Sequence, residues 1–214
     1  MNPQAQERAR ETAARCEQLG FSLNDAQSVA LAGYLDLLVK WNKVMNLVGR
    51  SDWRDILDHL VVDSLYLADF VRGLELPDSP ECWDLGAGAG LPGLPLRMLW
   101  QKGRYHLVDA REKRAIFLRT VLAAFPLPGV LVFQGRVEAF MPTRPPADLI
   151  VSRAFMPWEK VLHLVRDFTV PGSFCLFLTL VPLPPDLPQG WTAHAEKRYM
   201  TTSTPRFFWA LRRG

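Results

Sequence analysis

Apolar side chains in the first third of the chain recur every three or four residues, the spacing of one face of an α-helix. The pattern predicts three helices, at residues 4–19, about 22–41 and about 52–71. Gly20 is a natural C-terminal cap for the first helix, and Ser22 with Asp25 resembles a capping box at the start of the second. The stretch GLELPDSPE at residues 73–81 then interrupts the pattern and predicts a linker.

After the linker, short apolar runs alternate with amphipathic stretches. The strand-like runs are CWDL, RYHLVD, VLVFQ, DLIVS and GSFCLFLTL, and the stretches from WTAHAEKRYM and RFFWALRR are candidates for a closing antiparallel pair. The helical stretches between the strands are LPLRMLW, EKRAIFLRTVLAAF and PWEKVLHLVRDF. Alternation of this kind predicts an α/β fold with a mostly parallel, doubly wound sheet of seven strands and helices on both faces. We therefore expect a helical extension at residues 1–76 and a sheet domain at residues 77–214.

The composition is that of an ordinary globular protein, with 214 residues, 49% of them hydrophobic and 22% charged. No apolar run approaches the length of a membrane span, and the charged N-terminus lacks the apolar core of a secretory signal. We therefore expect a cytoplasmic protein with no membrane partner. Three widely spaced cysteines, Cys16, Cys82 and Cys175, disfavour a disulfide framework or a zinc site. Cys82 and Cys175 lie in strand-like stretches and are predicted to be buried small side chains.

Charge is distributed unevenly along the chain. Residues 1–80 hold 8 Lys and Arg against 12 Asp and Glu, whereas residues 81–214 hold 17 against 10. A basic C-terminal part is compatible with an anionic partner such as nucleic acid. On charge alone, a solvated basic surface is the simpler interpretation.

The segment WDLGAGAGLPGLPL, residues 83–96, is a glycine-rich loop that fits two cofactor patterns. Gly86, Gly88 and Gly90 form G-x-G-x-G after Asp84, while the last two of these with Gly93 form the dinucleotide pattern G-x-G-x-x-G. Asp109 ends the next predicted strand and suits a ribose-binding acid in either register. The spacing of the acid therefore does not decide between them.

Three observations favour the first register. The apolar strand ends at Leu85, so the loop begins at Gly86. The following helix must start near Pro92, which places Gly93 inside it. The chain also has no Tyr-x-x-x-Lys and little room for the second domain of a dehydrogenase. An acid followed by G-x-G-x-G is typical of class I methyltransferases that use S-adenosylmethionine (SAM), where the acid at the next strand end accepts hydrogen bonds from the ribose.

Six motifs occur in an order that resembles one family. They are WNKVMNLVGRSD, VDSL, DLGAGAGLPGLPL, LVDAREKRAIFLR, GRVEAF and VSRAF, and they span roughly residues 20–180. With them the chain resembles the bacterial 16S rRNA guanine-N7 methyltransferases, also called the glucose-inhibited division protein B family. The resemblance implies a class I, Rossmann-like methyltransferase sheet with an N-terminal helical extension. It also implies SAM-dependent methylation of N7 of a guanine at position 527 of 16S rRNA, with the small ribosomal subunit or its precursor as partner; we expect a monomer.

The same resemblance implies a set of site residues. Asp84 and Asp109 would bind the cofactor. The other cofactor-binding residues would be Gly86, Gly88, Gly90 and Leu91 of the loop and Val137 and Glu138 of GRVEAF. Arg153 of VSRAF would lie beside the cofactor and the incoming guanine, as the candidate catalytic residue. Guanine N7 has a free lone pair and needs no general base, so positioning can supply most of the catalysis. Contact of Arg153 with the SAM carboxylate, a phosphate or guanine O6 fits this chemistry.

Other residues have two open interpretations. Basic side chains after Asp109 and at the C-terminus either contact RNA phosphates or are solvated: Lys113, Arg114, Arg119, Arg206, Arg212 and Arg213. Phe155 and Trp158 are candidate stacking platforms for an RNA base, and Trp41 is expected to be a core anchor.

Two departures from the family pattern keep other functions open. His59 lies four residues before Asp63 where the family has a His three residues before, and Thr179 and Leu180 replace a family Lys-Gly. A SAM-dependent methyltransferase for another RNA or a small molecule is one alternative. A non-catalytic RNA-binding module is another, and the intact set of loop glycines and acids argues against it.

Overall fold

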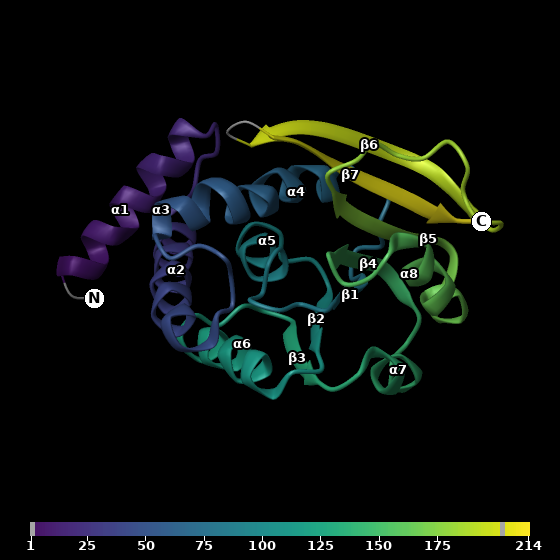
Figure 1. Ribbon diagram of the computed structural model, residues 1–214, viewed down its shortest axis with the longest axis horizontal. Helices are drawn as coiled ribbons and strands as arrows, with labels where there is room; N and C mark the ends of the chain where they lie inside the picture. The colour runs from purple at the N-terminus through teal and green to yellow at the C-terminus, as the bar shows by residue number, and fades with distance from the viewer. Residues whose placement is uncertain (1–2, 202–203) are drawn as a thin grey trace.

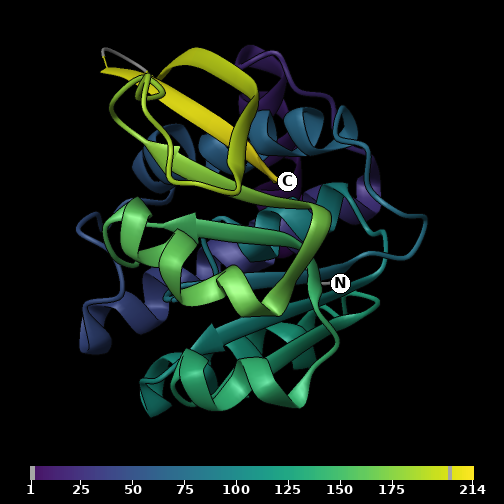
Figure 2. The same ribbon diagram turned by 90° about the vertical axis from the view of Figure 1, so that its right-hand side faces the viewer.

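A seven-stranded sheet forms the centre of the molecule (Figures 1 and 2). This computed structural model describes residues 3–201 and 204–214. The strand order is β3-β2-β1-β4-β5-β7-β6. The strands are β1 (Glu81–Leu85), β2 (Arg104–Asp109), β3 (Val130–Gln134), β4 (Ala147–Arg153), β5 (Thr169–Thr179), β6 (Trp191–Thr201) and β7 (Thr204–Arg213). The first five strands are parallel, and β7 is antiparallel to both of its neighbours. The predicted fold class and closing pair are thus confirmed.

Helices cover both faces of the sheet, and each face has its own apolar core. The helices are α1 (Pro3–Gln18), α2 (Asp25–Met45), α3 (Trp53–Ile56), α4 (Val62–Arg72), α5 (Gly93–Leu99), α6 (Glu112–Ala124), α7 (Val137–Phe140) and α8 (Trp158–Val165). Short 3₁₀ turns, Met141–Thr143 and Arg166–Phe168, follow α7 and α8. The larger core joins the sheet to helices α2, α4, α5 and α6, and the smaller joins it to α7 and α8.

The second helix begins with a capping box, but not at the predicted residues. Asn24 Oδ1 accepts from the Gln27 backbone N–H at 2.9 Å, and Gln27 Oε1 accepts from the Asn24 N–H at 3.0 Å. The box proposed at Ser22 and Asp25 is therefore wrong. A capping side chain must directly precede the first helical residue, which is Asp25, and Ser22 lies too far upstream.

The third predicted helix is interrupted by a π-helical turn. Asp52 caps α3 by accepting from the N–H groups of Arg54 and Asp55. The π turn Leu57–Val61 follows, with the N–H of Val62 bonded to the oxygen of Leu57. Apolar spacing did not predict this turn, because a single spacing of five among spacings of three and four still resembles the pattern of one α-helix.

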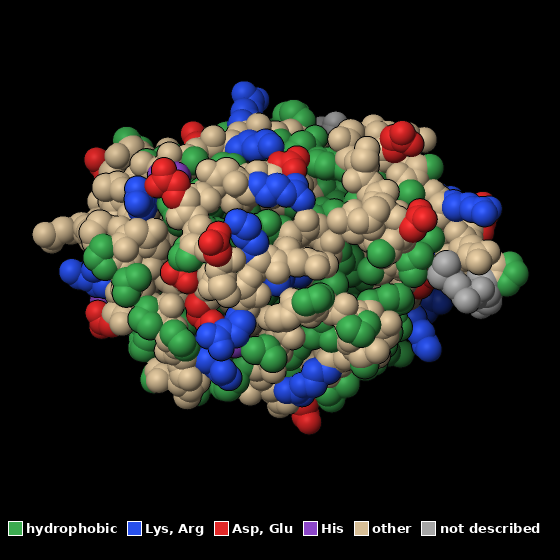
Figure 3. Space-filling model, turned by 180° about the vertical axis from the view of Figure 1, so that it is seen from behind, with side chains coloured by type: hydrophobic (Ala, Val, Ile, Leu, Met, Phe, Trp, Pro, Cys, Tyr) green, Lys and Arg blue, Asp and Glu red, His purple; other side chains and the backbone are tan. Residues whose placement is uncertain are grey.

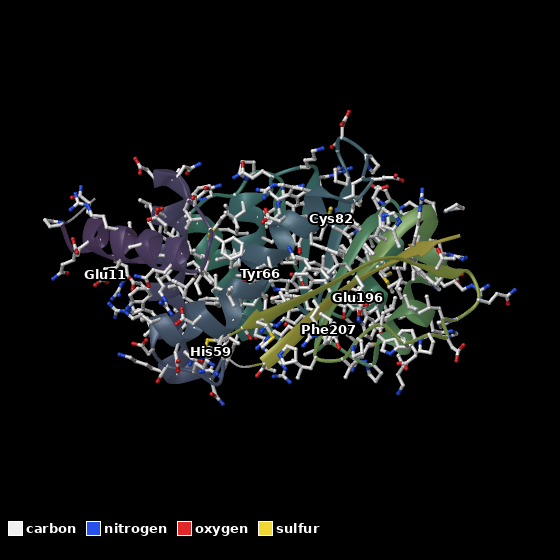
Figure 4. The ribbon with its side chains drawn as sticks, turned by 90° about the horizontal axis from the view of Figure 1, so that it is seen from above. Glu11, His59, Tyr66, Cys82, Glu196 and Phe207 are labelled. Carbon is white, nitrogen blue, oxygen red and sulfur yellow. The ribbon has the colours of Figure 1, made fainter. Side chains whose placement is uncertain are left out.

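The helical extension packs directly on the rest of the chain. Tyr66 and Phe70 of α4 contact Tyr199 and Phe208 of the β6–β7 hairpin, with ring centroids 4.7 and 5.6 Å apart. The hairpin accordingly lies against α4 (Figures 1 and 4). Trp41 contacts Phe117 of α6 at 5.7 Å, as expected of an anchor between the extension and the sheet domain. The division at residue 76 stays a prediction.

The back face of the molecule carries mixed charges, and the cysteines are buried. Figure 3 shows Lys and Arg interspersed with Asp and Glu on the back face, and they do not gather into one patch there. Cys16, Cys82 and Cys175 are buried free thiols, and burial was predicted for Cys82 and Cys175. Among the described residues, no helix is long and apolar enough to cross a membrane, and no cluster of His, Cys, Asp and Glu fits a metal ion.

Candidate functional site

A cavity of about 520 Å³ opens at the carboxyl edge of the sheet. Strand β1 lies between β2 and β4 there, so the chain leaves the centre of the sheet in both directions, where α/β proteins bind ligands. Four predicted site residues line the cavity: Gly86, Asp109, Val137 and Glu138. Its other lining residues come from the strand ends and the loops after them: Val108, Ala110, Arg111, Arg114, Gly135, Arg136, Ala154, Phe155 and Met156.

The glycine loop has a backbone that other residues adopt only with strain. Gly86, Gly88 and Gly90 have φ angles of 75°, 60° and 80°, in the left-handed region. The N–H groups of Gly86 and Ala87 both bond to the oxygen of Val108, which ties the loop to β2. Three left-handed glycines in the G-x-G-x-G register agree with the interpretation that these residues shape the loop.

Gly93 has a different role. It is the first residue of α5, and a Cβ added there would collide with the Asp84 carboxylate and the side chain of Leu107. It therefore lets the helix approach the sheet closely. The last glycine of the dinucleotide pattern allows the same close helix–sheet packing, so the register of the loop stays a prediction.

Asp84 is a buried residue of β1 that bonds to the start of α5, directly after the loop. Its side chain is buried, and its carboxylate accepts from the backbone of Gly93 and from the hydroxyl of Tyr105 at 3.4 Å. Burial raises the pKa of this carboxyl to about 7. Asp84 does not line the cavity, so its predicted contact with a cofactor stays a prediction.

Asp109 connects the loop to the turn after β2. Its two oxygens accept from the N–H of Gly88 at 2.9 Å and from the N–H of Arg111 at 2.8 Å. Arg114 Nη1 lies 3.5 Å from the same carboxylate. A carboxylate held by two backbone donors at the mouth of a cavity has lone pairs left to accept from hydroxyl groups of a ligand.

Strand β4 ends in a sharp change of direction. Ala154 has a φ of 52°, which is unusual for a residue with a Cβ. After it, Phe155 and Met156 line the cavity, and the Phe155 ring lies over Gly86. The sequence predicts Phe155 only as a stacking platform for an RNA base. The position of Phe155 directly after the end of a predicted strand could have indicated that it lines the cavity.

Arg153 does not line this cavity. Its Nη2 lies 3.2 Å from Asp63 Oδ2, and its Nη1 donates to the oxygen of Leu60 at 3.3 Å. Asp63 is 1% exposed and also accepts from the Tyr199 hydroxyl at 2.9 Å and from Arg206 Nη1 at 2.7 Å. Burial raises the pKa of the Asp63 carboxyl, and the charges of Arg153 and Arg206 act in the opposite direction.

The remaining loop residues line no part of the cavity. Gly88 and Gly90 shape the loop, and Leu91 is packed in the core. Their proposed cofactor contacts, like that of Arg153, stay predictions.

Several basic residues have partners within the protein. Arg206 bonds to the buried Asp63, Arg212 lies 3.5 Å from Glu75, and Arg213 donates to the oxygen of Gly190. Arg206 therefore belongs to a buried cluster and is not a simple solvated or RNA-facing residue. The displaced His59 lies 3.6 Å from Asp55, and its backbone oxygen accepts from Arg206 (His59 is labelled in Figure 4).

A second hollow of about 180 Å³ adjoins the first and shares Ala154 and Met156 with it. It has an aromatic lining of Trp158, Phe177 and Trp209, and Trp158 meets Trp209 edge to face at 5.9 Å. Ser152 and Thr179 add polar atoms at the ends of β4 and β5. A flat aromatic group next to the first cavity would fit this lining.

The family profile described as GidB, rRNA small subunit methyltransferase G, matches residues 27–179. A protein of Nitratidesulfovibrio vulgaris strain Hildenborough named ribosomal RNA small subunit methyltransferase G is 57% identical, over 92% of this chain and 90% of its own length. Proteins of the same name from Lawsonia intracellularis and Enterobacter sp. strain 638 are 49% and 35% identical, over 92% and 84% of this chain and 92% and 84% of their own lengths.

Solved structures show the same fold at low sequence identity. A mutant of MtNAS in complex with S-adenosylmethionine has a TM-score of 0.59 at 14% identity, over 98% of this chain and 88% of that one. A putative methyltransferase, yhhF from Escherichia coli, has a TM-score of 0.58 at 17% identity, over 73% of this chain and 89% of that one. These likenesses support the class I methyltransferase fold.

Proposed function

Because the chain belongs to the rRNA small subunit methyltransferase G (GidB) family, we propose that it transfers a methyl group from SAM to N7 of a guanine in 16S rRNA. The proposed acceptor is position 527 in the small ribosomal subunit or its precursor. The observation that carries the proposal is the cavity at the centre of the carboxyl edge, bounded by the glycine loop and by Asp109 inside the region that the family profile matches.

The residues of the cavity fit a nucleoside cofactor. A glycine loop with left-handed backbone lets a ligand approach the main chain closely, and a Cβ at Gly86 would already collide with Phe155. The Asp109 carboxylate lines the cavity and would accept from the ribose hydroxyls, and Val137 and Glu138 would border the adenine.

The reaction requires that the acceptor guanine is positioned, and it requires no general base. SAM bound there supplies an electrophilic methyl group on a sulfonium. Guanine N7 carries a lone pair and no proton at neutral pH, so no side chain has to remove one. The protein's task is to hold the acceptor base in line with the methyl group and to exclude water, and orientation of this kind contributes several kcal/mol to catalysis.

We assign the acceptor base to the aromatic hollow. RNA-binding proteins commonly read unpaired bases by stacking them on aromatic side chains. Trp158 is half-buried and offers such a surface, while Phe177 and Trp209 are buried and complete the lining. The two shared residues put the hollow next to the first cavity. Phe155, the other stacking candidate, lies in the cofactor cavity instead. We also propose that the protein is a monomer and that it acts in the cytoplasm.

The proposal is tested with SAM labelled in its methyl group and with small ribosomal subunits that lack the modification. We expect label in 16S rRNA and none in large subunits treated in parallel. Label in another RNA or a small molecule, with 16S rRNA unlabelled, would favour the alternative acceptor. Absence of SAM binding in calorimetry would favour a non-catalytic module.

A further inference from the structure

A third hollow, of about 470 Å³, lies beside the first cavity and the aromatic hollow. It is lined from α7 and α8, which pack on the same face of the sheet (Figure 1). The lining residues are Glu138, Met156, Glu159, Lys160, His163 and Leu164. Within the described chain, Met156 is the one residue that lines all three hollows.

Two residues form the boundary between the first cavity and the aromatic hollow. Ala154 and Met156 line both of them. Ala154 contributes only a methyl group, on a backbone held at a φ of 52°. Met156 is half-buried and carries a long side chain, so this side chain determines how wide the passage between the two hollows is.

The width of this passage matters for the proposed reaction. The lone pair of guanine N7 forms the new bond to the methyl carbon, the electron pair of the broken C–S bond stays on sulfur, and no proton moves. The reacting atoms must therefore come within about 3–3.5 Å of each other in a straight line, and an error of about 1 Å can cost as much as 100-fold in rate.

A methionine suits a boundary between two ligands. Its side chain is unbranched and has three rotatable bonds, so it fills irregular gaps and adapts to the groups beside it. The third hollow borders the same side chain and leaves it space to adjust. A β-branched or aromatic residue would have less of this freedom.

We propose that Met156 is a positioning residue that separates the cofactor from the acceptor base and sets the distance between the methyl group and N7. The inference rests on the proposed function for the identity of the two ligands. In this account Met156 contributes little to the affinity for either ligand, and it acts on their relative placement.

The first experiment compares Met156→Ala and Met156→Leu with the wild type. The measurements are the Kd for SAM by calorimetry, kcat and KM with small subunits, and the thermal midpoint. We expect Met156→Ala to lower kcat about tenfold while the Kd for SAM and the KM for subunits stay within about threefold. Leucine fills a similar volume, so Met156→Leu should keep at least about a third of the wild-type kcat.

Leu164→Ala is the matched control. Leu164 is half-buried and lines the third hollow, but it lines neither the first cavity nor the aromatic hollow. Its truncation removes similar apolar contact and should lower the thermal midpoint to a similar extent, while kcat stays within about twofold of the wild type.

Two results would overturn the positioning role. One is a kcat in Met156→Ala that falls no further than in Leu164→Ala, since Met156 would then contribute packing alone. The other is a Kd for SAM that weakens by the same factor as kcat falls, since Met156 would then be a binding residue. If Met156→Ala does not fold, Met156→Phe narrows the passage instead, and a wild-type kcat in that variant would refute the proposal.

A spectroscopic measurement tests the position of Met156 without any acceptor. The chain has six methionines, and labelling of their ε-methyl groups with ¹³C allows each to be followed by NMR. The Met156 signal is assigned by its absence from Met156→Leu. We expect it to shift when SAM is added, while the signal of Met98, in the core on the other face of the sheet, stays in place.

A Met156 signal that does not respond to saturating SAM would place this side chain away from the cofactor and overturn the proposal. If the signal shifts but the wild type methylates an acceptor other than 16S rRNA, the proposed function fails. The same variants, assayed with that acceptor, then still test the role of Met156.

Discussion

Asp109 and Asp63 are both nearly buried carboxylates at the same edge of the sheet, but they are held in different ways. Asp109 accepts from two backbone N–H groups, those of Gly88 and Arg111, within the loops of neighbouring strands. Asp63 accepts from the side chains of Tyr199 and Arg206 and contacts Arg153, residues that are 136, 143 and 90 positions away. One centre is built from local backbone, and the other from side chains that only the complete fold brings together.

The difference shows how each part of the site can fail. Backbone around Asp109 is shaped by left-handed glycines, so substitutions there should act on cofactor binding through the shape of the loop. The Asp63 cluster joins α4, β4 and the hairpin, so substitutions there also act on stability. The following experiments separate the two centres, and they run from the largest expected effect to the smallest.

Gly88→Val should abolish measurable SAM binding. A β-branched residue at a φ of 60° is strained, and it would distort the loop that borders the cavity at Gly86. We expect the affinity measured by calorimetry to fall more than about 100-fold, which corresponds to roughly 2.7 kcal/mol.

Gly20→Val is the matched control for this substitution. Gly20 also has a left-handed φ, of 88°, but a Cβ there meets no atom within 4 Å and lies far from the cavity. It should cost similar stability and leave the Kd for SAM unchanged. Retained affinity in Gly88→Val would show that the loop does not contact the cofactor.

Asp84 lies between the two centres and should make stability depend on pH. Its pKa is about 7 in the folded protein against an ordinary value of 3.8, so its contribution to stability is fully present below about pH 4 and is lost as the pH rises through 7. The loss amounts to at most about 4 kcal/mol.

Asp84→Asn should remove most of that slope in unfolding measured between pH 4 and 8. Asp69→Asn is the control, since Asp69 is 57% exposed, and it should keep the wild-type slope. A wild type and an Asp84→Asn variant with parallel profiles would mean that Asp84 is ionised in the folded protein throughout this range.

Asp109→Asn should weaken SAM binding about tenfold, because a charged acceptor for the ribose hydroxyls is lost while the shape is kept. Asparagine has one acceptor oxygen, so one of the two backbone donors also loses its partner, at a cost of about 1 kcal/mol in the free energy of unfolding. Glu112→Gln, at the exposed start of α6, controls for loss of a nearby charge. Equal affinities for SAM in Asp109→Asn and the wild type would remove Asp109 from the cofactor site.

Ala154→Gly should have the smallest effect. Glycine relieves the strain of the left-handed φ but adds freedom to the unfolded chain, and the two terms nearly cancel to within about 1 kcal/mol. Because Ala154 separates Arg153 from Phe155, a more flexible turn should weaken SAM binding about twofold in calorimetry. A tenfold loss would indicate that the strained turn itself fixes both neighbours.

The same contrast explains what the sequence could predict. The five parallel strands and the closing pair followed from apolar spacing, and the tight loop after β1 followed from its glycines. The π turn and the position of the capping box depend on shifts of one or two residues that periodicity does not resolve. The partners of Arg153 and Arg206 could not be predicted, because no local pattern specifies contacts between residues that are 90 or more positions apart.

The most direct test of the central claim maps the methyl group itself. Purified protein, SAM and small subunits lacking the modification are incubated together, and nuclease fragments of the 16S rRNA are analysed by mass spectrometry. The account predicts a single N7-methylguanine, at position 527, formed only when SAM is present. An unmodified 16S rRNA, or a methyl group on another base or another atom, would contradict it.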